Sequence, residues 1–168
     1  MRRIKLTQGK VSLIDECDFL LISKHKWRVT KTNPTSKTWY AMATIKFPSG
    51  NWETVYMHRF LTNAPAGVEV DHINGSGLDN RRGNLRVCSR TQNRMNTFSR
   101  KHTSRYKGVG FSKKLPKESP WTARLGIDGK MIYLGGFKTQ REAALAYNHA
   151  ALERYGEFAK LNEVAREA

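Results

Sequence analysis

The chain has 168 residues, enough for one ordinary domain or two small ones. Its 30 Lys and Arg outnumber its 14 Asp and Glu, and the net charge of +16 favours nucleic acid as the partner. Two cysteines exclude a disulfide framework and form no Cys-x-x-Cys zinc pattern. Because no apolar run has signal-peptide or membrane-span length, we expect a cytoplasmic protein with no membrane contact.

The first half of the chain alternates short strands with short helices. Alternating apolar residues predict a hairpin over 2–14, and an acidic then apolar stretch favours a short helix within 15–24. The turn at 48–51 separates two further strands. These strands span 38–47 and 52–57, and a short helix over 58–61 follows them.

A second hairpin and a helix follow. We expect a strand over 68–72, a loop rich in Gly, Asn and Asp over 74–84, and a strand over 85–87. Ser89 and Gln92 have the spacing of a capping box, which predicts that a helix begins there. Residues 94–105 lack apolar periodicity and are interpreted as a linker between two domains.

The last third predicts a sheet covered by one helix. Strands are expected over 106–111, 121–127 and 131–137. Thr139 and Glu142 have capping-box spacing at the start of a helix that Gly156 ends. The small and aromatic residues on one face of this helix would pack against the sheet; they are Ala143, Tyr147, Ala150 and Ala151.

Positive charge is concentrated in the middle of the chain. Residues 1–98 have a net charge of +9 and residues 99–168 one of +7. Between Asp79 and Glu118 there is no acidic residue, although twelve basic ones lie there. Since ordinary surfaces mix the two signs, both halves are expected to contact one polyanion.

An aspartate directly before a histidine ends the 68–72 strand, so the two side chains point to different sides. Taken singly, Asp71, His72, Asn84 and Asn93 fit ordinary turn, surface or core roles. Their order and spacing are more specific. The motif is Asp71-His72-Ile73-Asn74-Gly75, Leu78-Asp79-Asn80-Arg81-Arg82 and Asn84-Leu85-Arg86, preceded by Tyr56-Met57-His58-Arg59.

This motif resembles the His-Asn-His (HNH) homing endonucleases of phages and introns, which are ββα-metal nucleases. The resemblance implies that Asp71 and Asn93 hold one divalent cation, Mg²⁺ or Mn²⁺. It implies that His72 is the general base and that Asn84 ties the loop together and orients His72. Products with 5′-phosphate and 3′-hydroxyl ends would follow. The role of His58 stays open.

The C-terminal third resembles the APETALA/ethylene-response-factor DNA-binding domain. The residues that carry this resemblance are Ser104-Arg105-Tyr106-Lys107-Gly108-Val109, Trp121-Thr122-Ala123-Arg124, Tyr133-Leu134-Gly135-Gly136-Phe137, Ala146-Tyr147 and Leu161-Asn162. It implies a sheet face in the DNA major groove, with Lys107, Arg124 and Tyr133 toward DNA. Gly110 and Ser112 replace arginines that are frequent in the plant domains, so a different target is expected.

We therefore predict an α+β protein that acts as a site-selective, metal-dependent DNA endonuclease. An HNH module with an N-terminal β subdomain covers 1–98 (ββα-metal core about 56–97), a basic linker 99–104, and a three-stranded antiparallel sheet packed on one helix 105–168. The partner is double-stranded DNA, a monomer that nicks is favoured, and the location is the bacterial host cytoplasm if a phage encodes the chain. The expected DNA-contacting side chains are Arg81, Arg82, Arg86, Arg90, Arg94, Lys101, Arg105, Lys107, Lys113, Lys114, Arg124 and Tyr133.

Two other classes stay open. One is a DNA-binding regulator without nuclease activity, against which the joint presence of Asp71, His72, Asn84 and Asn93 argues. The other is a protein that binds structured RNA. Residues 1–55 would either contact DNA or only support the nuclease fold.

Overall fold

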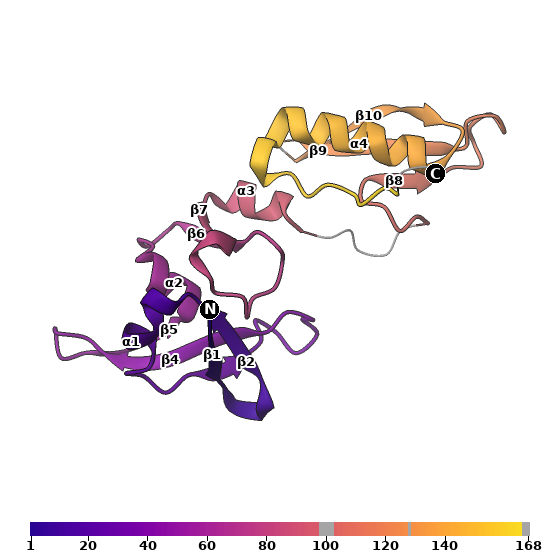
Figure 1. The fold of residues 1–168 in the computed structure, drawn as a ribbon. Helices are drawn as coiled ribbons and strands as arrows, with labels where there is room; N and C mark the ends of the chain where they lie inside the picture. Colours follow the sequence, from indigo (N-terminus) through magenta and orange to yellow (C-terminus); the bar gives the residue numbers. More distant parts are fainter. Residues whose placement is uncertain (98–102, 128, 166–168) are drawn as a thin grey trace. The chain divides into compact units, whose positions relative to one another are not determined.

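The computed structural model describes residues 1–97, 103–127 and 129–165. It is a mixed α/β structure with several small sheets and few helices, coloured along the chain in Figure 1. Two compact units divide the chain, residues 1–93 and residues 94–168, and each is described by itself. Within the described ranges, no helix is long and apolar enough to cross a membrane.

The first unit begins with a hairpin and a three-stranded antiparallel sheet of order β3-β4-β5, which confirms the strands expected at 2–14, 38–47 and 52–57. The short helix expected within 15–24 is also confirmed. The strand β3 was not predicted, because it is three residues long and has a single buried side chain, Val29. The elements are β1 (Arg2–Lys5), β2 (Val11–Ile14), α1 (Phe19–Ile22), β3 (Arg28–Thr30), β4 (Tyr40–Lys46) and β5 (Trp52–Tyr56).

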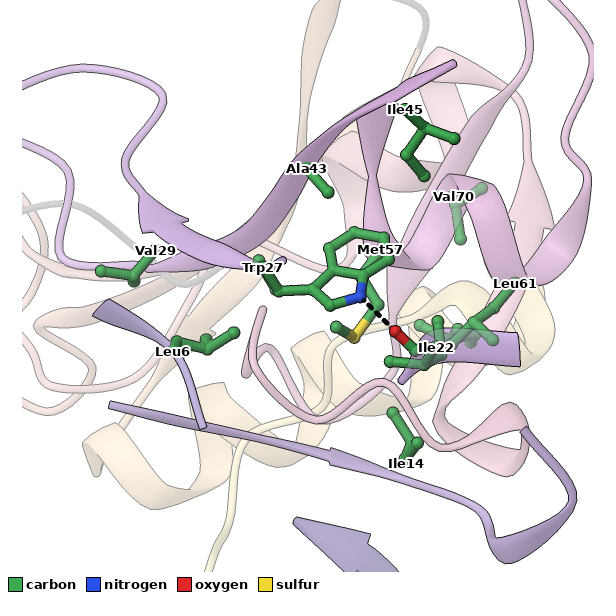
Figure 2. Close-up of a cluster of buried hydrophobic side chains, with 12 residues drawn as sticks. Leu6, Ile14, Ile22, Trp27, Val29, Ala43, Ile45, Met57, Leu61 and Val70 are labelled. Carbon is green, nitrogen blue, oxygen red and sulfur yellow. Dashed lines mark hydrogen bonds between the residues drawn. The ribbon is translucent and has the colours of Figure 1, made fainter. Parts of the chain in front are cut away.

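An apolar core holds this unit together (Figure 2). On β4 the alternate residues Ala41, Ala43 and Ile45 are buried, as the period of a strand requires. The helix α2 (Met57–Thr62) adds Met57 to the core. Figure 2 also shows Trp27 among these side chains, where its indole N–H donates to the Ile22 carbonyl at 2.8 Å.

A strand–strand–helix unit completes this part of the chain. The antiparallel pair β6 (Glu69–His72) and β7 (Leu85–Cys88) is followed by α3 (Arg90–Met95), close to the expected bounds. The expected capping box is confirmed. Ser89 Oγ accepts from Gln92 N at 3.2 Å, and Gln92 Oε1 accepts from Ser89 N at 2.8 Å.

The second unit is a three-stranded antiparallel sheet with one helix against it (Figure 1). The strands are β8 (Val109–Phe111), β9 (Trp121–Ile127) and β10 (Lys130–Phe137), and the helix is α4 (Gln140–Tyr155). The buried residues of α4 are Ala143, Ala144, Tyr147 and Ala151; Ala150, expected on this face, is partly buried against the same core.

The strand expected over 106–111 begins only at Val109, so the prediction is wrong for its first three residues. Gly108 has a left-handed φ of +75°, which extended backbone does not adopt. A Cβ atom there would lie 2.1 Å from the Tyr147 ring, so glycine lets the chain turn directly against α4.

Candidate active site

The strand–strand–helix unit carries the four residues of the motif on neighbouring elements. Asp71 and His72 end β6, Asn84 lies in the turn that enters β7, and Asn93 lies in α3. Asp71, His72 and Asn84 are buried, and Asn93 is half-buried. Ordinary surface side chains of these types stay in water, so their burial marks a site with specific partners.

Asn84 closes the loop between β6 and β7. Its side-chain oxygen accepts from Asn74 N at 3.0 Å, and its Nδ2 donates to the Asp79 carbonyl at 2.7 Å. Its backbone carbonyl accepts from Ile73 N at 2.9 Å. Asn84 therefore has the contacts of a residue that ties the loop together.

His72 has a buried hydrogen-bond partner in the loop between β6 and β7. Its Nε2 lies 3.2 Å from Asn80 Oδ1, and Asn80 is fully buried. Burial lowers the pKa of His72, while the Asn80 hydrogen bond and the charges of Asp71 and Asp79 oppose that shift. The imidazole is therefore neutral at pH 7, which is the state that a general base needs.

An aromatic cluster surrounds the His72 ring. The ring centroids of His58 and Tyr40 lie 5.0 and 5.9 Å from it, and Tyr56 stacks on His58 at 5.4 Å. Burial, helped by the nearby His72 and Arg59 charges, lowers the pKa of His58 to about 3. Among the described residues, His58 Nδ1 has no hydrogen-bond partner.

Both expected metal ligands, Asp71 and Asn93, have a hydrogen-bonded side-chain partner. Arg86 donates to Asp71 Oδ2 from Nε at 2.9 Å and from Nη2 at 2.7 Å, and Asn93 Nδ2 donates to Glu69 Oε2 at 2.5 Å. Asp71 and Asn93 offer the hard oxygen atoms that Mg²⁺ prefers, which fits an ion completed by water and substrate phosphate. Within the described ranges, no cluster of three or more His, Cys, Asp and Glu could hold a metal by itself.

Several arginines of the predicted DNA-contacting set are held by carboxylates in the first unit. Arg81 pairs with Asp79, Arg82 with Asp18, and Arg86 with Asp71, each at 2.7 Å. The Arg82 side chain is about half exposed, whereas the Arg86 side chain is only 10% exposed. Arg90 and Arg94 both lie in α3 and are exposed.

In the second unit, the expected DNA-contacting residues Arg105, Lys113, Lys114, Arg124 and Tyr133 are exposed. Lys107 is half-buried instead, and its Nζ donates to the Met95 carbonyl at 2.5 Å. Burial and the nearby Lys160 lower the pKa of Lys107 to about 8. Lys101 and most of the expected linker over 99–104 lie outside the described residues.

The sequence assigns no role to Tyr56 and Asn80, which lie in the motif, and does not single out Tyr40 and Glu69. Glu69 lies two residues before Asp71, so the period of a strand places both on one face of β6. Tyr40 lies on β4 and His72 on β6, and no local sequence pattern indicates that their rings are in contact. Asn80 lies inside the quoted motif, and its burial alone distinguishes it from a turn residue.

A family model described as HNH endonuclease matches residues 58–95, a stretch that includes β6, β7 and α3. An uncharacterised HNH endonuclease of Acanthamoeba polyphaga mimivirus is 30% identical over 163 residues, covering 94% of this chain and 77% of that protein. The chain therefore belongs to the HNH endonuclease family and is a DNA endonuclease. Nucleases of this family generally use a divalent metal.

Plant proteins match a shorter stretch of this chain. APETALA2-like protein 2 of Oryza sativa is 38% identical over 63 residues, 38% of this chain and 14% of that protein. An AP2-like ethylene-responsive transcription factor of Arabidopsis thaliana is 38% identical over 65 residues, 39% of this chain and 13% of that protein. These matches are partial and cover a small share of the plant proteins.

Proposed function

We propose that this chain is a site-selective, metal-dependent HNH endonuclease of the homing type. It hydrolyses one phosphodiester of double-stranded DNA at a time and leaves 5′-phosphate and 3′-hydroxyl ends. The observation that carries the proposal is the buried His72 directly after the buried Asp71 at the end of β6, with Asn84 closing the loop to β7 and Asn93 on the helix that follows. One such site cuts one strand at a time, so a monomer nicks.

In this mechanism, the chain binds and orients the reacting groups around His72. His72 takes the proton of the attacking water, and Asn84 keeps the loop in place. Asp71 and Asn93 would hold the divalent cation, Mg²⁺ or Mn²⁺. When bound, that cation stabilises negative charge on the scissile phosphate and on the leaving oxygen. Arg86 holds the Asp71 carboxylate in position through hydrogen bonds from Nε and Nη2.

The second unit is proposed to be the APETALA-type reader of the target site. The core residues Ala123 and Leu125 pack with α4, so the intervening Arg124 points to the opposite face of the sheet. Tyr133 lies directly opposite Arg124 on β10, which places both on that outer face. A depression of about 340 Å³ lies there beside Gly110, and a base edge can approach it closely.

Linking the two units makes the second DNA contact intramolecular and so raises occupancy at the right site. A phage gene acting in the cytoplasm of a bacterial host fits this activity. Because the chain carries a net charge of +16, binding is expected to weaken steeply with salt. Each neutralised phosphate contributes about 0.9 to the slope of log affinity against log salt.

The test is cleavage of supercoiled DNA by the wild type and by His72→Ala, with Mg²⁺ and with a chelator. The wild type with Mg²⁺ is expected to give nicked circles with 3′-hydroxyl ends, and the chelator should stop the reaction. His72→Ala should bind the same DNA and fail to cut it. Tight binding without cleavage under every divalent metal would show that this chain only binds DNA, and equal cleavage by His72→Ala would refute the base role.

A further inference from the structure

The N-terminal hairpin contacts the loop that carries the HNH motif. Leu13 N donates to the Leu78 carbonyl at 2.8 Å, and Asn80 N donates to the Leu13 carbonyl at 2.8 Å. The next turn of the chain adds an ion pair, in which Arg82 binds the buried Asp18 at 2.7 Å. Leu13 and Asp18 therefore hold in place the loop that carries the HNH motif.

Inside this contact lies a chain of fully buried polar groups. Asn80 Nδ2 donates to Ser12 Oγ at 2.8 Å, and Ser12 Oγ lies 3.0 Å from the Leu78 carbonyl and 3.3 Å from Met57 Sδ. A hydroxyl has one proton to donate. Because a carbonyl and a thioether can only accept, that proton points toward them, and Ser12 Oγ accepts from the Asn80 amide.

This proton count fixes which way the Asn80 amide points. If the amide were reversed, Ser12 would donate to Asn80, and two oxygen atoms, Ser12 Oγ and the Leu78 carbonyl, would lie 3.0 Å apart with no proton between them. For a fully buried hydroxyl that arrangement is unfavourable. The Asn80 oxygen therefore faces His72, 3.2 Å from its Nε2.

A carbonyl oxygen accepts a hydrogen bond, so the nitrogen facing it must carry the proton. In a neutral imidazole the other nitrogen, Nδ1, then holds the basic lone pair. The rings of His58 and Tyr40 pack edge-on or tilted against His72 and hold the plane of its ring. These ring contacts do not choose between the two nitrogens, whereas the Asn80 contact does.

We infer that Asn80, oriented by Ser12, is a positioning residue that keeps the proton of His72 on Nε2 and leaves Nδ1 as the catalytic base. The inference rests on the proposed base role of His72. It assigns to the N-terminal hairpin a function in catalysis, because β2 supplies Ser12. Asn84, in turn, shapes the loop.

The experiment reads the tautomer directly. Protein labelled with ¹⁵N-histidine is examined at pH 8 by long-range ¹H–¹⁵N correlation, and the signal missing from His72→Ala identifies His72. The wild type is expected to show the Nε2–H form. Asn80→Ala should show a mixture of the two forms, and Ser12→Ala a smaller shift in the same direction, because its Asn80 amide can reverse.

Cleavage by the same variants is measured in parallel. For Asn80→Ala we expect kcat to fall about 10- to 100-fold, as for residues that orient a reacting group, while KM for DNA stays within about twofold, since binding energy is not removed. Asn80→Asp, which keeps an acceptor toward Nε2, should recover the Nε2–H form and part of kcat. Asn33→Ala, in an exposed loop, is the matched control and should behave as the wild type.

An Nδ1–H form in the wild type would overturn the inference, and so would an unchanged tautomer in both Asn80→Ala and Ser12→Ala. A loss confined to KM would also overturn it. The spectrum of the wild type does not depend on cleavage. Failure of the proposed base role would appear as normal cleavage by His72→Ala, and it can therefore be told apart from failure of the tautomer inference. If Asn80→Ala does not fold, the spectra of Ser12→Ala and of the wild type still test whether the Asn80 contact sets the tautomer of His72.

Discussion

The two units differ in where they place polar side chains. Among the described residues, the first unit buries Ser12, Asp18, His58, Asp71, His72, Asp79, Asn80 and Asn84, and the second buries Asn96 and Thr122. The buried residues of the second core are otherwise alanine, valine, leucine and tyrosine. A buried polar group is costly unless it is hydrogen-bonded. The first unit therefore needs many side-chain hydrogen bonds, and it has them around the candidate active site.

This difference agrees with the separate tasks that we propose for the two units. In the first, buried polar side chains are hydrogen-bonded to one another or to arginines, and these contacts position His72 and Asp71. In the second, an apolar core supports a sheet whose outer residues are exposed. Substitutions in the second core should therefore change stability and DNA selectivity, while those in the first should change catalysis.

The largest effect is expected from Gly108→Ala in the second unit. The added Cβ would lie 2.1 Å from Tyr147 Cδ2 at a left-handed φ of +75°, so both packing and backbone are strained. We expect a loss of more than about 4 kcal/mol in the stability of this unit. Amide hydrogen exchange should show lost protection over 109–158 and unchanged protection over 2–88.

The same variant tests the division of labour. Mg²⁺-dependent nicking should persist while preference for the target site is lost. Gly126→Ala, whose Cβ would only touch Met131 at 3.5 Å, is the stability control. Loss of nicking together with lost protection in the first unit would mean that the two cores fold as one.

Arg86→Met should have the next largest effect, and in the first unit. It removes the positive charge bound to the buried Asp71, which is expected to cost roughly 3 kcal/mol without metal. If Asp71 binds the divalent cation, Mg²⁺ should raise the urea midpoint of Arg86→Met more than that of the wild type. Arg90→Met, at an exposed position of α3, is the control. Equal shifts in all three proteins would place the metal elsewhere.

His58 should make the first unit sensitive to acid. Its pKa is lowered from 6.5 to about 3, so below pH 6.5 the unfolded chain binds a proton that the folded chain does not. Stability is therefore lost as the pH falls from 6.5 toward 3, by about 1.4 kcal/mol per pH unit. In His58→Phe, which keeps a ring against Tyr56, unfolding measured between pH 7 and 5 should show a smaller slope.

The sequence predicted most elements of both units, because alternation, turn residues and capping boxes are local signals. It also indicated Asp71, His72, Asn84 and Asn93 by their spacing. It could not indicate that Asn80 contacts His72 or that Ser12 contacts Asn80, because Ser12 and Asn80 are 68 positions apart and no local pattern pairs them. The sequence likewise could not indicate that the Arg86 guanidinium binds Asp71. From the sequence, Arg86 was predicted to contact DNA.

The smallest effects are expected from matched helix caps in the two units. Ser89 Oγ accepts from Gln92 N at 3.2 Å and Thr139 Oγ1 from Glu142 N at 3.1 Å, so each Ala substitution should cost about 1 kcal/mol. Their consequences should differ. Ser89→Ala loosens the first turn of α3, which carries Asn93, and should lower kcat, with more Mg²⁺ needed for half-maximal rate. Thr139→Ala should weaken DNA binding and leave kcat at saturating DNA unchanged, and a lowered kcat there would contradict the separation of the two units.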